Sequence, residues 1–77
     1  MALEIKYFGM LTGITQKSSE QIESEPDLDR LMKVLKERHP GLAGVRFSVS
    51  VNRRLVHDNS PIADGDEIAL LPPFAGG

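Results

Sequence analysis

The last residues of the chain are the ones whose types and spacing could support chemistry. In order they are Pro72, Pro73, Phe74, Ala75, Gly76 and Gly77. Because glycine has no Cβ, Gly76-Gly77 is the thinnest stretch of polypeptide available and can enter a narrow channel in another protein. The reacting group would then be the terminal carboxylate of Gly77, which is a poor electrophile until it is activated.

Activation of this carboxylate has a direct chemical route. Attack on the α-phosphate of ATP would give an acyl-adenylate, and sulfur transfer to that carbonyl would give a thiocarboxylate, a soft nucleophile on a protein handle. The competing explanation is a floppy terminus with accidental glycines. Pro72-Pro73 favours the functional explanation, since both prolines prefer extended polyproline geometry and form a stiff spacer before Phe74.

The rest of the chain must position this tail, and its hydrophobic pattern indicates strands around one main helix. Residues 9–14 are expected to fold back on the core through a short helical turn. A tight turn at Asp64-Gly65-Asp66 precedes the last strand. Alternation of apolar and polar residues predicts strands at 2–8 and 47–51. Residues 16–24 are expected to form a polar edge or half-exposed strand in which only Ile22 points inward. Two further strands are expected at 55–56 and 67–71.

The clearest helix runs from Leu28 to His39. Asp27 is the expected N-cap, and Asp29 adds negative charge to the first turn. Pro40 cannot continue the helix and therefore ends it. The spacing of the apolar residues predicts one buried face made of Leu28, Leu31, Met32 and Leu35.

This order of elements predicts an α+β fold of the ubiquitin-like β-grasp type, with a mixed sheet against one main helix. The first and last strands are expected to lie adjacent and parallel at the centre of the sheet, because the helical middle supplies the crossover that a parallel pair needs. We expect a single domain over residues 1–77, with residues 72–77 as a flexible tail.

Composition excludes several classes of function. The chain has no cysteine, so it has no disulfide or thiolate nucleophile, and a net charge of -2 does not favour nucleic-acid binding. Its first residues carry charge early and resemble neither a signal peptide nor a membrane anchor, so the cytoplasm is the expected location. No metal site is expected, since His39 suits a helix C-terminus and His57 has no ligand spacing around it.

The last third of the chain carries a family resemblance. Residues 51–56, Pro61-Ile62 and residues 64–77 combine an asparagine after an alternating strand, a D-G-D-E turn, and a hydrophobic strand that runs into P-P and G-G. This combination resembles the small sulfur-carrier subunits of molybdopterin synthase, in the MoaD/ThiS group. The likeness is weak between residues 9 and 46.

The resemblance implies a carrier that binds no cofactor and is not catalytic alone. A ubiquitin-activating-like (E1-like) enzyme would use ATP to adenylate Gly77, and a sulfur donor protein would supply the sulfur of the thiocarboxylate. The tail would enter the large subunit of molybdopterin synthase, in a heterotetramer. There the sulfur would pass to cyclic pyranopterin monophosphate to form the dithiolene of molybdopterin.

The resemblance also implies an apolar docking face near the tail. It maps to Phe8, Leu55 and Leu71, for which ordinary core packing is the alternative that alternation leaves open. Phe74 lies outside any strand and is expected to contact a partner. The tail residues Pro72, Pro73 and Ala75 complete the expected partner-binding set.

Three other functions remain open from the sequence. The chain could carry sulfur for thiamine thiazole synthesis, although the Pro-Pro before an aromatic residue resembles the molybdopterin branch. It could modify proteins, with Gly77 joined to lysine by an isopeptide bond. It could also be a β-grasp domain that only mediates contacts, with incidental glycines.

Overall fold

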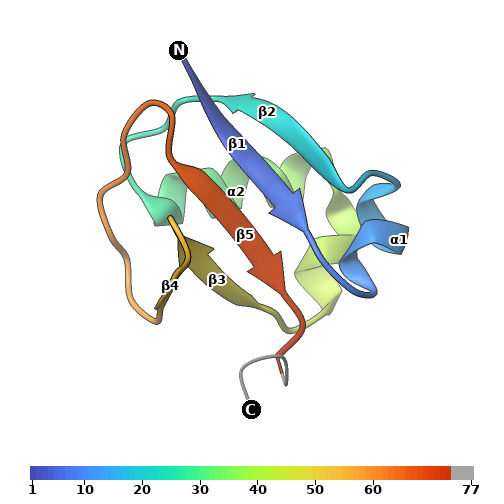
Figure 1. Cartoon of the computed structure of the whole chain (residues 1–77). Coiled ribbons are helices and arrows are strands. Elements are labelled where there is room, and N and C mark those ends of the chain that lie inside the picture. The colour runs from blue at the N-terminus through green and yellow to red at the C-terminus, as the bar shows by residue number, and fades with distance from the viewer. Residues whose placement is uncertain (74–77) are drawn as a thin grey trace.

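The computed structural model describes residues 1–73 and contains a five-stranded mixed sheet (Figure 1). The strands lie in the order β2-β1-β5-β3-β4. The elements along the chain are β1 (Ala2–Tyr7), α1 (Leu11–Thr15), β2 (Ser19–Glu23), α2 (Leu28–Arg38), the 3-10 helix η1 (Pro40–Gly44), β3 (Ser48–Val51), β4 (Arg54–Val56) and β5 (Glu67–Leu71).

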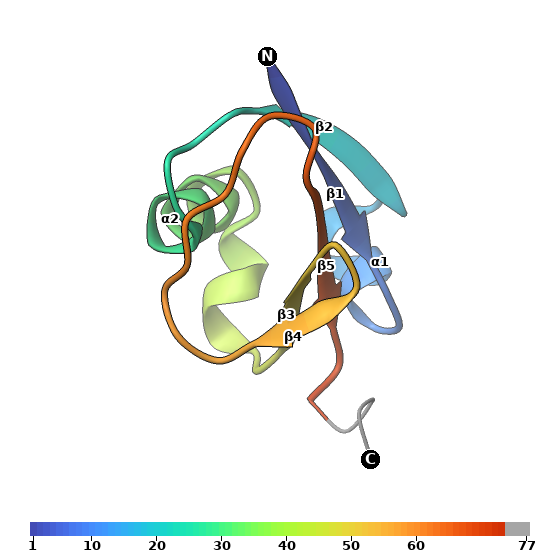
Figure 2. The same ribbon diagram turned by 60° about the vertical axis from the view of Figure 1, so that its left-hand side comes forward.

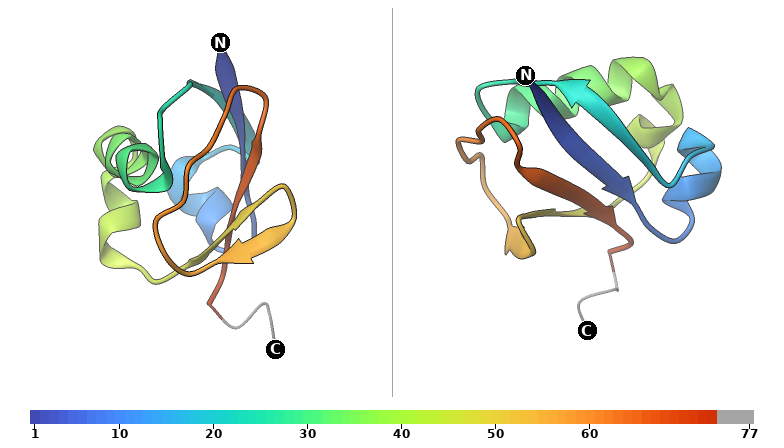
Figure 3. Two further views of the ribbon diagram at one scale, coloured as in Figure 1. Left: turned by 90° about the vertical axis from the view of Figure 1, so that its left-hand side faces the viewer. Right: turned by 45° about the horizontal axis from the view of Figure 1, so that its top comes forward.

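The first and last strands form the central pair of the sheet. β1 is parallel to β5, with Ile5 opposite Ile68 and Tyr7 opposite Leu70, whereas the other neighbouring strands are antiparallel. This confirms the predicted ubiquitin-like arrangement. Because β1 and β5 run in the same direction, β5 ends beside the end of β1, at the opposite end of the sheet from Met1 (Figure 3).

Helix α2 covers one face of the sheet (Figure 2) and begins and packs as its sequence predicts. The Asp27 side chain accepts a hydrogen bond of 3.0 Å from the backbone N–H of Arg30, which satisfies a free donor of the first turn. Leu28, Leu31 and Leu35 are buried, whereas Met32, the fourth residue of the predicted face, is half-buried. Burial of each fully buried leucine side chain contributes roughly 1.5–3 kcal/mol. The other buried apolar side chains come mainly from the central strands: Leu3, Ile5, Tyr7, Leu11, Ile22, Leu42, Ile62, Ile68 and Leu70.

Several boundaries differ from the sequence prediction. The first strand ends at Tyr7 and leaves Phe8 outside, and the second begins at Ser19 because α1 ends in a left-handed residue, Gln16, with φ 62°. The main helix ends at Arg38, and the expected loop after it contains the 3-10 helix at Pro40–Gly44. No helix within residues 1–73 has the length and apolar character needed to cross a membrane.

The β3–β4 hairpin is tied to the turn before β5 by one asparagine. Asn52 and Arg53 both have positive φ (50° and 71°), as the tightest hairpin turns require. The side-chain amide of Asn52 donates to Asp66 Oδ1 at 3.0 Å, and its oxygen accepts from the backbone N–H of Glu67 at 3.0 Å. The predicted tight turn is also present, with Gly65 at φ +84°.

Candidate partner-binding face and tail exit

The sheet face opposite α2 carries a row of side chains that crosses four strands. The strand register places Lys6 beside Ala69, Ala69 beside Ser50, and Ser50 beside Leu55. Ala69 and Ser50 are small, so the middle of the row stands lower than its surroundings. Both are only 7% exposed although neither belongs to the hydrophobic cluster behind the sheet.

These small residues form the floor of a hollow with a volume of about 440 Å³. Residues from the end of β1, from β3, β4 and β5, from the β3–β4 turn and from the first position after β5 line this hollow. The lining residues are Lys6, Phe8, Ser48, Ser50, Arg53, Leu55, Glu67, Ala69, Leu71 and Pro72.

Charged groups border one side of the hollow. Lys6 Nζ lies 2.9 Å from Glu67 Oε2, and Arg53 Nε lies 3.8 Å from Glu67 Oε1. The hydrogen bond from Lys6 is the main reason that the pKa of Glu67 lies below its ordinary value. The hollow therefore combines an apolar wall with a rim of paired charges, a composition suited to a protein partner.

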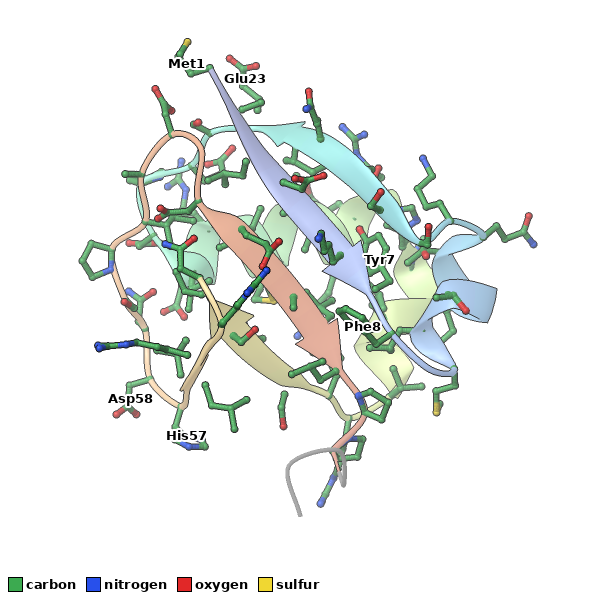
Figure 4. The ribbon with its side chains drawn as sticks, viewed as in Figure 1. Met1, Tyr7, Phe8, Glu23, His57 and Asp58 are labelled. Carbon is green, nitrogen blue, oxygen red and sulfur yellow. The ribbon has the colours of Figure 1, made fainter. Side chains whose placement is uncertain are left out.

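The predicted docking residues Phe8, Leu55 and Leu71 all line this hollow. Phe8 is 44% exposed and Leu55 is 49% exposed, so the core alternative is wrong for these two, and Leu71 is half-buried. Figure 4 shows Phe8 at the end of β1, where the strand has just finished. Partner binding by the three residues stays a prediction.

The hollow reaches the point where the chain leaves the sheet. Pro72, half-buried, forms part of its lining, and Pro73 next to it is exposed. The predicted contact residues Phe74 and Ala75 and the predicted reactive end Gly76-Gly77 lie outside the described residues.

A second polar cluster lies on the helix-covered side of the sheet. Nε2 of His39, at the C-terminal end of α2, lies 2.6 Å from Oε2 of Glu20 on β2, and the Tyr7 hydroxyl donates to the same carboxylate. Burial alone would raise the pKa of Glu20, but hydrogen bonds from Tyr7, His39 and Lys17 together lower it. Burial, with help from Glu20, raises the pKa of Tyr7 above its ordinary range.

Sequence reasoning missed the floor and rim of the hollow. Arg53 lies in a hairpin turn and Ser50, Ala69 and Glu67 lie in strands, and no local motif groups these four residues. Their alternation with buried neighbours placed them on the outer face. The expected parallel pairing of β1 with β5 is the one feature that could have grouped these residues, because it places Lys6 beside Ala69.

Comparisons with known proteins point in one direction. A family model described as the ThiS family matches residues 5–77. A molybdopterin synthase sulfur carrier subunit from Homo sapiens is 35% identical over 82 residues, which cover 97% of this chain and 93% of the human protein.

Solved structures agree with this match. A complex of subunits 1 and 2 of the molybdopterin-converting factor from Helicobacter pylori contains a chain that is 32% identical, with a TM-score of 0.73 and full coverage of both chains. SAMP1 from Haloferax volcanii has a TM-score of 0.81 over 100% of both chains, and at 24% identity this likeness shows the fold alone. The match over residues 5–77 and the human relative together show that the chain belongs to the ThiS family.

Proposed function

We propose that this chain is the sulfur carrier subunit of a molybdopterin synthase and that its Gly77 carboxylate carries the sulfur. The observation that carries the proposal is the position of the hollow, whose lining includes Leu71 and Pro72. A partner seated on this hollow lies where the chain departs toward Gly76-Gly77. Support for the molybdopterin branch comes from the human relative and from the Helicobacter pylori complex of two subunits.

The chemistry begins with activation of the terminal carboxylate. Its oxygen attacks the α-phosphorus of ATP on an E1-like enzyme, and pyrophosphate leaves. Sulfide delivered by a sulfur donor protein then attacks the acyl-adenylate carbonyl, AMP leaves, and Gly77 ends in a thiocarboxylate. This chain needs only to present the carboxylate, since the enzyme supplies ATP and the catalytic groups.

Sulfur transfer follows in the large subunit. The thiocarboxylate sulfur attacks a carbon of cyclic pyranopterin monophosphate, and a C–S bond forms as the C–O bond at that carbon breaks, its oxygen leaving on the phosphate group or as water. Water then cleaves the bond between the carbonyl carbon and sulfur, which returns Gly77 to its carboxylate. Two such transfers form the dithiolene of molybdopterin. We propose a heterotetramer with two large subunits, in the cytoplasm, in which this chain is a co-substrate and not a catalyst by itself.

The first experiment measures intact mass after incubation with ATP, a sulfide source and an E1-like enzyme. The proposal expects the mass to rise by the exchange of one oxygen for sulfur. A variant without Gly77 serves as the control and is expected to stay unmodified while it still binds the large subunit. Molybdopterin synthesis by that truncated chain would show that the proposed chemistry is wrong.

A second experiment decides the branch. The full chain is used to capture partners, and recovery of a molybdopterin synthase large subunit is expected. Recovery of a thiazole synthase instead would move the function to thiamine synthesis. Covalent attachment to lysines of many cellular proteins would make the chain a protein modifier.

A further inference from the structure

A glycine in the turn after β1 lies against the first residue of the tail. Gly9 has φ +59°, a left-handed conformation that glycine adopts at little cost. A Cβ added to Gly9 would lie 2.6 Å from Cγ of Pro72, a distance too short for two carbon atoms. The ring of Pro72 therefore occupies the space that a side chain at residue 9 would need.

The contact follows from the centre of the sheet. Since β1 and β5 are parallel, their ends lie side by side, and the Phe8 backbone N–H donates to the Leu70 carbonyl at 3.1 Å. The turn at Gly9 is held on its other side as well, because the Thr12 hydroxyl donates to the Gly9 carbonyl at 2.9 Å. The backbone around Gly9 is thus held by hydrogen bonds at the Phe8 N–H and at the Gly9 carbonyl, and the Pro72 ring packs against Gly9.

We infer that Gly9 is a positioning residue that sets where the reactive tail leaves the body. Each proline holds its φ near -65°, so the placement of Pro72 is passed to Pro73 with little rotational freedom. Only four residues follow before the end of the sequence. A displaced Pro72 therefore changes the position and direction in which the chain leaves the sheet, relative to the docking face. This inference rests on the proposed function.

Gly9 also links the tail to the docking face. Its neighbour Phe8 lines the hollow together with Pro72. A partner that covers Phe8 and Leu55 therefore also meets Pro72, whose position is limited by its contact with Gly9. Phe8 contributes contact area to the docking face, whereas Gly9 has no side chain and contributes only the space that the Pro72 ring fills. Substitutions at the two positions should therefore affect binding and sulfur transfer differently.

The test compares sulfur transfer by Gly9→Ala with that of the full wild-type chain, each charged as the thiocarboxylate and mixed with the large subunit and pterin substrate. We expect kcat to fall about tenfold or more, because a misplacement of about 1 Å can cost on the order of 100-fold. We expect the KM for the carrier and its Kd for the large subunit to change little. A loss confined to KM would instead mean that Gly9 supports docking.

Two other glycines provide matched controls. Gly65→Ala adds a methyl group at φ +84° with nothing within 4 Å, so it carries the backbone strain without the contact with Pro72. Gly13→Ala, in α1, also meets nothing within 4 Å. Both are expected to transfer sulfur at the wild-type kcat, whatever their melting temperatures. A fall in Gly65→Ala equal to that in Gly9→Ala would assign the effect to strain and overturn the inference.

A rescue variant tests the route through Pro72. Pro72→Ala removes Cγ, the atom that a Cβ at residue 9 would strike. The effect of Gly9→Ala on kcat is expected to be much smaller in the Pro72→Ala background than in the wild type. Equal effects in both backgrounds would show that Gly9 does not act through the proline.

The outcomes also separate this inference from the proposed function. A wild-type chain that never forms a thiocarboxylate would refute the proposed function. A reactive wild type with an equally fast Gly9→Ala variant would refute only the role of Gly9. If Gly9→Ala does not fold, Pro72→Gly removes the ring and leaves Gly9 intact. Wild-type kcat in Pro72→Gly would then overturn the inference, and a lower kcat measured at a saturating concentration of the large subunit would support it.

Discussion

Nε2 of His39 lies 2.6 Å from Oε2 of Glu20 and joins the end of α2 to the edge strand β2. The Glu20 side chain is only 7% exposed. Tyr7 donates to the same carboxylate, and its ring meets the His39 ring edge-on with centroids 5.8 Å apart. Tyr7 and Glu20 connect β1 and β2 to His39 at the end of α2. Substitutions in this cluster should therefore change the free energy of unfolding more than substitutions in surface ion pairs do.

The first prediction concerns acid. Since the folded protein lowers the pKa of Glu20, the unfolded chain binds more protons between the two pKa values, and stability rises with pH there. This contribution is complete above the ordinary glutamate pKa of about 4.3 and is lost as pH falls through the lower pKa of the folded state. Urea unfolding between pH 7 and 3 should show a shallower dependence for Glu20→Gln.

Glu37→Gln is the control for this measurement, because Glu37 is exposed on α2. Its pH dependence should match that of the wild type. Some acid sensitivity should remain in Glu20→Gln, since the pKa values of Asp66 and Glu67 are also lowered. An unchanged slope in Glu20→Gln would mean that this carboxylate is not coupled to folding.

The second prediction concerns the donor to Glu20. Tyr7→Phe keeps the ring in the core and removes only the hydroxyl hydrogen bond to the carboxylate. Hydrogen bonds to charged groups contribute about 1.5–3 kcal/mol, and the free energy of unfolding should fall by about this amount. The effects of Tyr7→Phe and Glu20→Gln should be non-additive in a double variant, as measured by chemical denaturation. Full additivity would contradict a shared network.

The third prediction separates two roles of Asn52. Asn52→Gly keeps the positive φ and removes the side-chain bonds to Asp66 and Glu67, so it should lose about 1–3 kcal/mol of stability. Asn52→Ala removes the same bonds but, unlike Asn52→Gly, keeps a Cβ in the left-handed region, so it should be about 1 kcal/mol less stable than Asn52→Gly. Equal stabilities in urea would show that the backbone conformation imposes no cost.

The same substitution has a local electrostatic effect. The hydrogen bond from Asn52, followed by that from the Ala63 backbone N–H, lowers the pKa of Asp66. Asn52→Gly removes the hydrogen bond from Asn52, which is the larger of the two causes of the lowered Asp66 pKa. An NMR titration should therefore find the Asp66 pKa closer to its ordinary value.

The fourth prediction tests the docking face directly. Leu55→Ala and Phe8→Ala should each weaken binding of the large subunit by about 2 kcal/mol, which is about 30-fold, if these side chains anchor the interface. Because both are exposed, unfolding free energies should stay within about 0.5 kcal/mol of the wild type. Met10→Ala is the control, since Met10 is 54% exposed but does not line the hollow. Calorimetric titration that finds the three variants alike would exclude this face.

Local features of the chain could be predicted from the sequence because they depend on near neighbours. The helix from Leu28, its Asp27 cap, the Gly65 turn and the inward-pointing Ile22 follow from periodicity and from the conformational preferences of single residues. The short chain left few ways to arrange one helix and five strands, so the central parallel pair could also be predicted. Boundaries were less accurate, as at Phe8 and Gln16, because turns there depend on what packs against them.

By itself the sequence determined the order of elements and the chemical character of the tail. Only the tertiary structure decided that Phe8 and Leu55 border one hollow, that Glu20 meets Tyr7 and His39, and that Gly9 lies beneath Pro72. The physical reason is strand register. Alternation assigns a side chain to a face of the sheet, but only the pairing between distant strands decides which side chains meet there.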